Sequence, residues 1–149
     1  MAKTSLIRLS EISTLPPKGA KKDSIQKKTA QLVKRLGELQ HLLYAEGKHS
    51  VLIILQGMDA SGKDGAVRKV FSECTIAGLD LVSFKKPSEE EFAHDFLWRV
   101  HRWAPQKGMF TIFNRSHYED ILIQRVHKWI DMTRVEKRMA AINAFEDLL

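Results

Sequence analysis

A glycine-rich loop between two apolar stretches constrains this chain more than any other feature. Residues 51–55 (VLIIL) form a short apolar run, rich in β-branched residues, which predicts a buried strand. Gly57, Gly62 and Lys63 follow with the spacing G-x-x-x-x-G-K, and apolar residues then recur at helical spacing over 67–71. Strand, glycine loop, lysine and helix together are typical of a phosphate-binding loop. Its backbone N–H groups and the helix N-terminus would surround a phosphate, and Lys63 would add a mobile positive charge.

Two acidic residues distinguish this loop from its common form. Asp64 stands where Ser or Thr usually follows the lysine, and Asp59 lies in the middle of the loop. An acid inside a polyphosphate-binding loop is unfavourable unless a cation separates the charges, so we expect Asp59 to face Mg²⁺. The alternative is that both are solvated acids, and Asp64 in a first helical turn suits the helix dipole. The loop residues expected to contact phosphate are Gly57, Met58, Ala60, Ser61, Gly62 and Asp64.

Charge is distributed unevenly along the 149 residues. The net charge is +6, and residues 1–50 carry all of this excess, with ten basic and four acidic side chains. Such a basic region attracts polyanions such as nucleic acid, inorganic polyphosphate or acidic surfaces. Alternatively, it is a solvated arm and helix face that keeps the protein soluble.

The composition also favours a soluble, cytoplasmic protein. No apolar run approaches the roughly 18 residues of a membrane span, and the N-terminus lacks a secretory apolar segment. A single cysteine, Cys74, cannot form an internal disulfide, so a reducing cytoplasm is the simplest setting. No recognised nucleic-acid-binding module is present, so a specific nucleic-acid partner is not expected.

The organisation of the chain predicts an α/β domain after a short arm. Residues 1–22 are expected to be a basic arm and 23–149 one domain, whose first helix starts at a cap on Asp23 and ends at Gly47. The apolar stripe of this helix packs on the sheet or pairs with another subunit. Further strands are predicted at 79–84 and 109–113, and the remaining helices at 88–103, 121–126 and 133–149.

Strands that alternate with helices give a parallel sheet covered by helices on both faces. Ligands bind beyond the carboxyl ends of such strands. The phosphate loop, Lys85-Lys86 and Asn114-Arg115 each follow one of the three strands, so we expect them to converge on one site.

Three motifs in this order closely resemble the polyphosphate kinase 2 family: GMDASGKDG at 57–65, HDFLWR at 94–99 and FNRSHYED at 113–120. The resemblance implies a thymidylate-kinase-like P-loop fold. It also implies Mg²⁺-dependent phosphoryl transfer between inorganic polyphosphate and nucleoside mono- or diphosphates. The third motif, with Asn114, is similar to the branch that accepts AMP and ADP.

The resemblance assigns roles to particular residues. Asp59, Lys63 and Arg115 would be catalytic, with Asp59 on Mg²⁺ and Arg115 neutralising the transferring phosphoryl group. Glu119 and Asp120 would reach nucleotide or Mg²⁺, or would simply form the acidic first turn of a helix. The other residues that would line the anion or nucleotide site are Lys85, Lys86, Arg99 and Asn114, with surface or structural roles as the alternative. His117 is expected to pack rather than to catalyse.

The resemblance also implies a further strand, a basic lid and closing helices beyond this chain, so the chain is expected to be the N-terminal portion of a kinase. Family members suggest a dimer or tetramer. Two alternatives stay open: a nucleotide kinase that uses ATP as the donor, and a non-catalytic module that binds polyanions or supports assembly.

Overall fold

The computed structural model describes residues 8–149 and contains two units, Met1–Leu32 and Val33–Leu149. Residues 1–7 of the predicted arm lie outside the described part. The first unit holds a 3₁₀ helix, η1 (Leu9–Glu11), an irregular segment, and the beginning of α1 (Lys22–Glu46). Because α1 begins at Lys22, Asp23 lies inside the first helical turn and is not the predicted cap.

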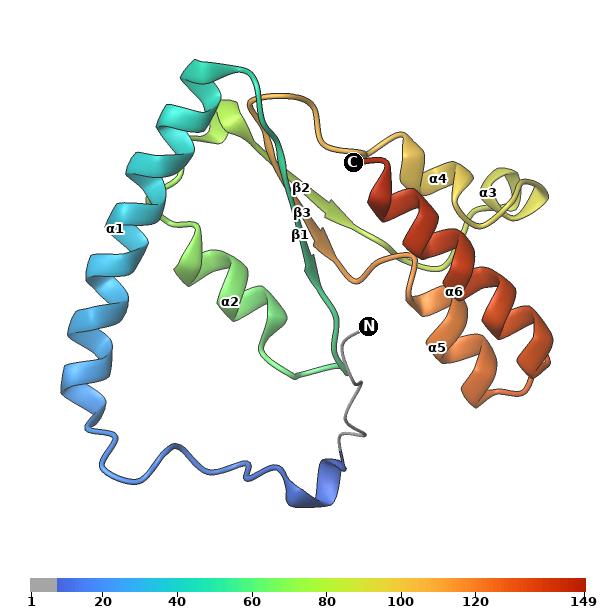
Figure 1. Cartoon of the computed structure of the whole chain (residues 1–149), viewed down its shortest axis with the longest axis horizontal. Helices are drawn as coiled ribbons and strands as arrows, with labels where there is room; N and C mark the ends of the chain where they lie inside the picture. Colours follow the sequence, from blue (N-terminus) through green and yellow to red (C-terminus); the bar gives the residue numbers. More distant parts are fainter. Residues whose placement is uncertain (1–7) are drawn as a thin grey trace. The chain divides into compact units, whose positions relative to one another are not determined.

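The second unit alternates strands and helices, as predicted (Figure 1). After α1 its elements are, in chain order, β1 (Val51–Leu55), α2 (Lys63–Val70), η2 (Ile76–Gly78), β2 (Leu79–Ser83), α3 (Glu89–Ala93), α4 (Trp98–His101), β3 (Phe110–Asn114), α5 (Glu119–Val126) and α6 (Met132–Asp147). The predicted strands agree with the observed ones to within one residue at each end. Within residues 8–149, no helix combines the length and the apolar character of a membrane span.

The three strands form a parallel sheet in the order β1-β3-β2. The first four residues of the middle strand β3 are all buried, three of them apolar and one a threonine, as expected for a strand covered on both faces. The predicted burial of residues 51–55 is only partly correct, because every residue of β1 is half-buried. This strand lies at an edge of the sheet, and within residues 8–149 no other strand pairs with its outer side.

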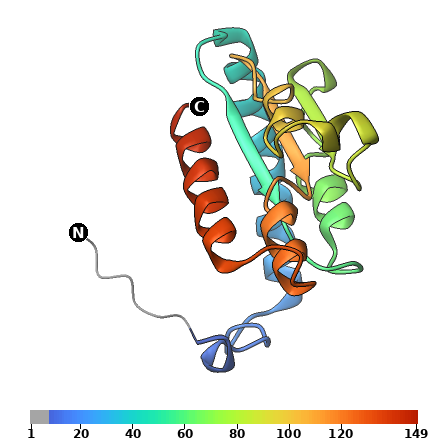
Figure 2. The ribbon, with the colours of Figure 1, turned by 90° about the vertical axis from the view of Figure 1, so that its right-hand side faces the viewer.

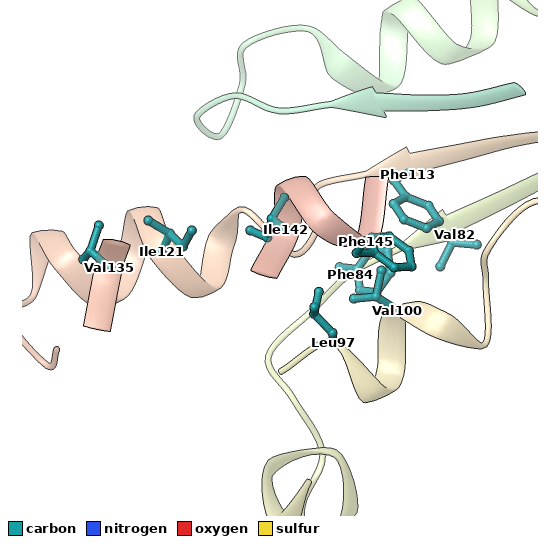
Figure 3. Packing of buried hydrophobic residues seen from close by; sticks show 9 residues of the cluster. All are labelled: Val82, Phe84, Leu97, Val100, Phe113, Ile121, Val135, Ile142 and Phe145. Carbon is teal, nitrogen blue, oxygen red and sulfur yellow. The ribbon is translucent and has the colours of Figure 1, made fainter. Parts of the chain in front are cut away.

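Helices cover both faces of this sheet, which confirms the predicted fold class. Helix α2 and the part of α1 within this unit lie on one face, and α3 to α6 lie on the other (Figures 1 and 2). Val82 and Phe113 are partners in the β2–β3 register and contribute to the main core cluster. Phe84 meets Phe113 edge to face at 4.8 Å, and Figure 3 shows both rings close to Val100 and Phe145. The core therefore fixes the carboxyl ends of β2 and β3 against the helices.

The predicted single helix over 88–103 is wrong, because the chain breaks it into α3 and α4. Ser88 caps α3 in a reciprocal capping box with Glu91. The break follows at His94, whose backbone is extended, and at Asp95, whose carboxylate accepts from Leu97 N at 2.9 Å. An aspartate that binds a nearby backbone N–H competes with helical hydrogen bonding, which accounts for the interruption.

Helix α1 packs closely on the segment that connects α2 to β2. Gln40 is fully buried and exchanges two hydrogen bonds with the backbone of Thr75. One turn earlier, Gly37 lies so close to Glu73 that a methyl group there would meet its carbonyl oxygen at 2.3 Å. Only glycine therefore fits at this helical position without displacing the connecting segment.

We expect Gly37→Ala to lower the free energy of unfolding by about 1–3 kcal/mol, since overpacking against backbone forces a shift. The measurement is urea unfolding of the two proteins. Gly65→Ala is the matched control, because nothing lies within 4 Å of a methyl group there and alanine is the better helix former. Equal unfolding midpoints for Gly37→Ala and the native sequence would refute this packing.

Candidate phosphate-binding site

A cavity of about 380 Å³ lies at the carboxyl ends of the three strands. Its lining comes from the loop after β1 (residues 59–65), the end of β2 (83–85) and the end of β3 (114–115). Parallel strands bring their carboxyl ends to one edge, so three segments far apart in the sequence meet here. The convergence predicted for the phosphate loop, Lys85 and Asn114-Arg115 is therefore present.

The glycine loop has the geometry that its sequence requires. Gly62 has a φ of +93° at the N-terminus of α2, a conformation that glycine adopts without strain. At Gly57 a methyl group would meet Ser61 Oγ at 2.8 Å, so a side chain there would displace the Ser61 hydroxyl. Lys63 Nζ donates to the carbonyls of Gly57 (2.8 Å) and Met58 (2.7 Å). The lysine thus holds its own loop, and an incoming phosphate would exchange these contacts for stronger charged ones.

The unusual acids of the loop each pair with a residue at the end of β3. Asp59 forms an ion pair with Arg115, and Asp64 Oδ1 accepts from Asn114 Nδ2 at 2.6 Å. Arg115 has a φ of +61° and its backbone N–H bonds to Leu55 O, so its backbone is fixed beside the end of β1. The two acids that distinguish this loop from its common form therefore each contact a residue of the motif at 113–120, on the other side of the cavity.

Glu119 is the second partner of Arg115 and does not line the cavity. Its carboxylate lies 3.5 Å from Arg115 Nη1 and also accepts from Gln56 Nε2. Gln56 in turn accepts from buried Ser116. This chain of contacts orients Arg115 toward Asp59.

Six predicted site residues do not line the cavity, namely Gly57, Met58, Lys86, Arg99, Glu119 and Asp120. Arg99 and Asp120 are 5% and 7% exposed and form an ion pair at 3.3 Å behind the cavity. Burial raises the pKa of the Asp120 carboxyl, against the opposing effects of Arg99, Arg138 and His117. Their geometry does not support direct contact of Arg99 with an anion, or of Asp120 with a metal ion. Lys86 is exposed and outside the lining as well.

His117 is packed, as expected from the sequence. Its ring is fully buried against Tyr118 and Phe145, and Nε2 lies 3.2 Å from Glu146 Oε1. Burial lowers the pKa of His117, while Glu146 opposes that effect. The ring therefore favours its neutral form, and it does not line the cavity.

The residues around the cavity fit a magnesium ion at one position. Asp59 offers an exposed carboxylate there, and Mg²⁺ is usually held by one or two carboxylates together with substrate phosphates and water. Among residues 8–149 no group of three or more His, Cys, Asp or Glu could hold a metal ion alone. This arrangement suits a metal ion that is bound jointly with a phosphorylated ligand.

Four residues of the site escaped the sequence analysis. Gly65, Ser83 and Phe84 line the cavity, and Gln56 supports it through Glu119. Gln56 could have been recognised from the sequence, since it is a polar residue between a buried strand and the first loop glycine. Nothing in the sequence marks Ser83 as a site residue, because only the strand register places it beside Asn114.

A second, larger cavity of about 600 Å³ lies between β1 and α6, which run side by side in Figure 2. Its lining is mostly apolar and contains one charged residue, Glu146. It offers no cation to a phosphate, so the smaller cavity is the candidate site.

Comparison with known proteins identifies the group to which the chain is related. Residues 19–149 match the family described as Polyphosphate kinase 2 (PPK2). The chain belongs to the polyphosphate kinase 2 family. This membership confirms the resemblance drawn from the three motifs.

Individual members of the polyphosphate kinase 2 family support the same conclusion. The AMP/ADP-polyphosphate phosphotransferase of Meiothermus ruber is 51% identical over 120 residues, which are 80% of this chain and 45% of that protein. The ADP-polyphosphate phosphotransferase of Rhodopseudomonas palustris is 54% identical over 95 residues, 64% of this chain and 33% of that protein. The crystal structure of Polyphosphate Kinase 2 from Arthrobacter aurescens TC1 matches with a TM-score of 0.90 and 41% identity, covering 95% of this chain and 52% of that one. The chain thus spans less than half the length of these two curated relatives.

Proposed function

We propose that this chain takes part in Mg²⁺-dependent phosphoryl transfer between inorganic polyphosphate and AMP or ADP. One observation carries the proposal: in a member of this family, Lys63, Lys85 and Arg115 surround one cavity together with two exposed acids, Asp59 and Asp64, of which Asp64 is bonded to Asn114. Three cations beside one metal-binding acid suit a chain of phosphates. The names of the relatives from Meiothermus and Rhodopseudomonas supply the nucleotides.

Phosphoryl transfer requires positioning and charge neutralisation more than covalent chemistry. The loop N–H groups and Lys63 would bind the terminal phosphates, and Arg115 would neutralise charge on the group in transfer. Mg²⁺, when bound, would supply further neutralisation of the phosphate charge. Asp59 would hold that ion after releasing Arg115, and Asn114 would keep Asp64 away from the phosphates.

The proposal also covers the cellular location, the partners and the oligomeric state of the protein. The even charge balance of residues 51–149 and the single cysteine support a cytoplasmic enzyme without a specific nucleic-acid partner. The exposed side chains of Leu39 and Leu42 on α1 support a homo-oligomer, because large apolar side chains are favoured at subunit contacts.

A donor assay tests this function. The chain is incubated with Mg²⁺ and AMP or ADP, with either polyphosphate or ATP as the sole donor, and the nucleotide products are separated. We expect product with polyphosphate. Transfer from ATP alone would favour an ordinary nucleotide kinase, and saturable polyphosphate binding without transfer would favour a polyanion-binding module.

A further inference from the structure

Behind the cavity lies a buried charged network that the proposed chemistry does not use. Arg99 from α4 and Asp120 from α5 form its centre, with Nη2 and Oδ2 3.3 Å apart. Gln124 donates to Asp120 Oδ1 at 3.2 Å, and Arg138 from α6 donates to both Asp120 O and Gln124. The polar groups of the pair are therefore bonded to protein rather than directed at a ligand.

One end of this network holds the end of β2. Arg99 Nη1 donates to Lys85 O at 2.8 Å, and its guanidinium lies over the Phe84 ring at 5.3 Å. Both Phe84 and Lys85 line the cavity. Arg99 does not line the cavity, but it fixes the backbone of Lys85, which does.

The other end holds the beginning of α5. Asp120 N bonds to His117 O, and Asp120 O accepts from Arg138, so the first turn of α5 is fixed from two sides. That turn carries Glu119, the partner of Arg115. The network therefore connects the supports of two cavity cations, Lys85 and Arg115.

Replacing a buried ion pair by apolar residues is often neutral or stabilising, so stability alone is a weak reason for this pair. We infer that Arg99 and Asp120 are positioning residues: their buried pair holds the Lys85 segment against the Arg115–Glu119 segment so that both cations reach the same anion. This inference rests on the proposed function, since it presupposes that the cavity binds phosphate.

The substitution Asp120→Asn distinguishes a positioning role from a purely electrostatic one, because the two predict opposite changes in anion affinity. Removing a negative charge near an anion site raises anion affinity if only electrostatics act. A positioning role predicts the opposite, a fall of about tenfold, of the size seen when residues that support a binding site are lost. The probe is tripolyphosphate, titrated calorimetrically into the folded protein with and without Mg²⁺.

We expect the fall in affinity to be equal with and without Mg²⁺. Unchanged or increased affinity would overturn the inference. A fall confined to the Mg²⁺ titration would also overturn it, because Asp120 would then act as a metal ligand.

A second variant guards against poor folding of Asp120→Asn. Arg99→Met/Asp120→Leu removes both buried charges together, so we expect it to fold and yet to lose about tenfold in tripolyphosphate affinity. Val135→Ala, at a buried position of α6 outside the network, is the control for lost stability and should bind normally. Native affinity in the double variant would overturn the inference.

The native protein and Lys63→Ala are titrated alongside. If the native protein shows no saturable binding, the proposed function fails and the inference fails with it. If the native protein binds, Lys63→Ala does not, and Asp120→Asn binds as the native protein does, then the inference alone fails.

Discussion

Lys63→Ala is expected to lower the affinity for tripolyphosphate by about 10- to 100-fold, since a hydrogen bond to a charged group contributes about 1.5–3 kcal/mol. Transfer from polyphosphate should fall further, by about 1,000-fold, because the developing charge loses a fixed cation. The lysine now donates to two carbonyls of its own loop, so its ammonium is already directed into the loop. Calorimetric titration and initial rates measure the two effects.

Lys69→Ala is the matched control for this prediction. Lys69 lies in the last turn of the same helix, α2, and is exposed outside the cavity lining. It removes the same charge from the same element, so we expect native affinity. A Lys63→Ala protein that binds and transfers like the Lys69→Ala protein would show that the loop is not the phosphate site.

Asp59→Asn is expected to affect binding and transfer in opposite directions. Without Mg²⁺, the affinity for tripolyphosphate should rise a few-fold, because Arg115 loses one of its two acidic partners and an exposed ion pair contributes only about 0.2–1 kcal/mol. With Mg²⁺, transfer should fall by at least about 100-fold, because the carboxylate proposed to hold the ion is lost. Titrations in chelator and rates in Mg²⁺ measure the two effects.

The control for Asp59→Asn is Asp147→Asn, an identical chemical change at the exposed end of α6. It should leave both quantities unchanged. If Asp59→Asn transferred phosphoryl groups at the native rate, Asp59 would not be the metal-binding residue. A decrease in its Mg²⁺-free affinity would instead exclude competition between Asp59 and the anion for Arg115.

Local features of this fold were predictable because each depends on a few neighbouring residues. The apolar run 51–55 and the spacing of Gly57, Gly62 and Lys63 predicted a strand, a tight loop and a helix start, all of which are present. The break between α3 and α4 was missed because it depends on one side-chain contact, Asp95 to Leu97 N, within an otherwise apolar helical pattern.

Contacts between side chains far apart in the sequence were harder to predict. Arg99 and Asp120 are 21 residues apart, and both belong to motifs that resemble ligand-binding segments. Their charges suggested an anion and a metal ion as partners, whereas the fold pairs them with each other. Similarly, the spacing of the loop acids suggested a cation beside Asp59 but gave no sign of its contact with Arg115, 56 residues away. The roles of the site residues in binding and transfer stay predictions.

The central claim is that the phosphate loop, Lys85 and Arg115 form one anion site at the sheet edge. Chemical-shift mapping tests it most directly: ¹H–¹⁵N spectra of the labelled chain are recorded during a tripolyphosphate titration. We expect saturable shifts in the amides of residues 57–65, of Lys85 and of Asn114-Arg115, and their loss in Lys63→Ala. Shifts confined to the basic residues 18–48, with the loop amides unmoved, would contradict the claim.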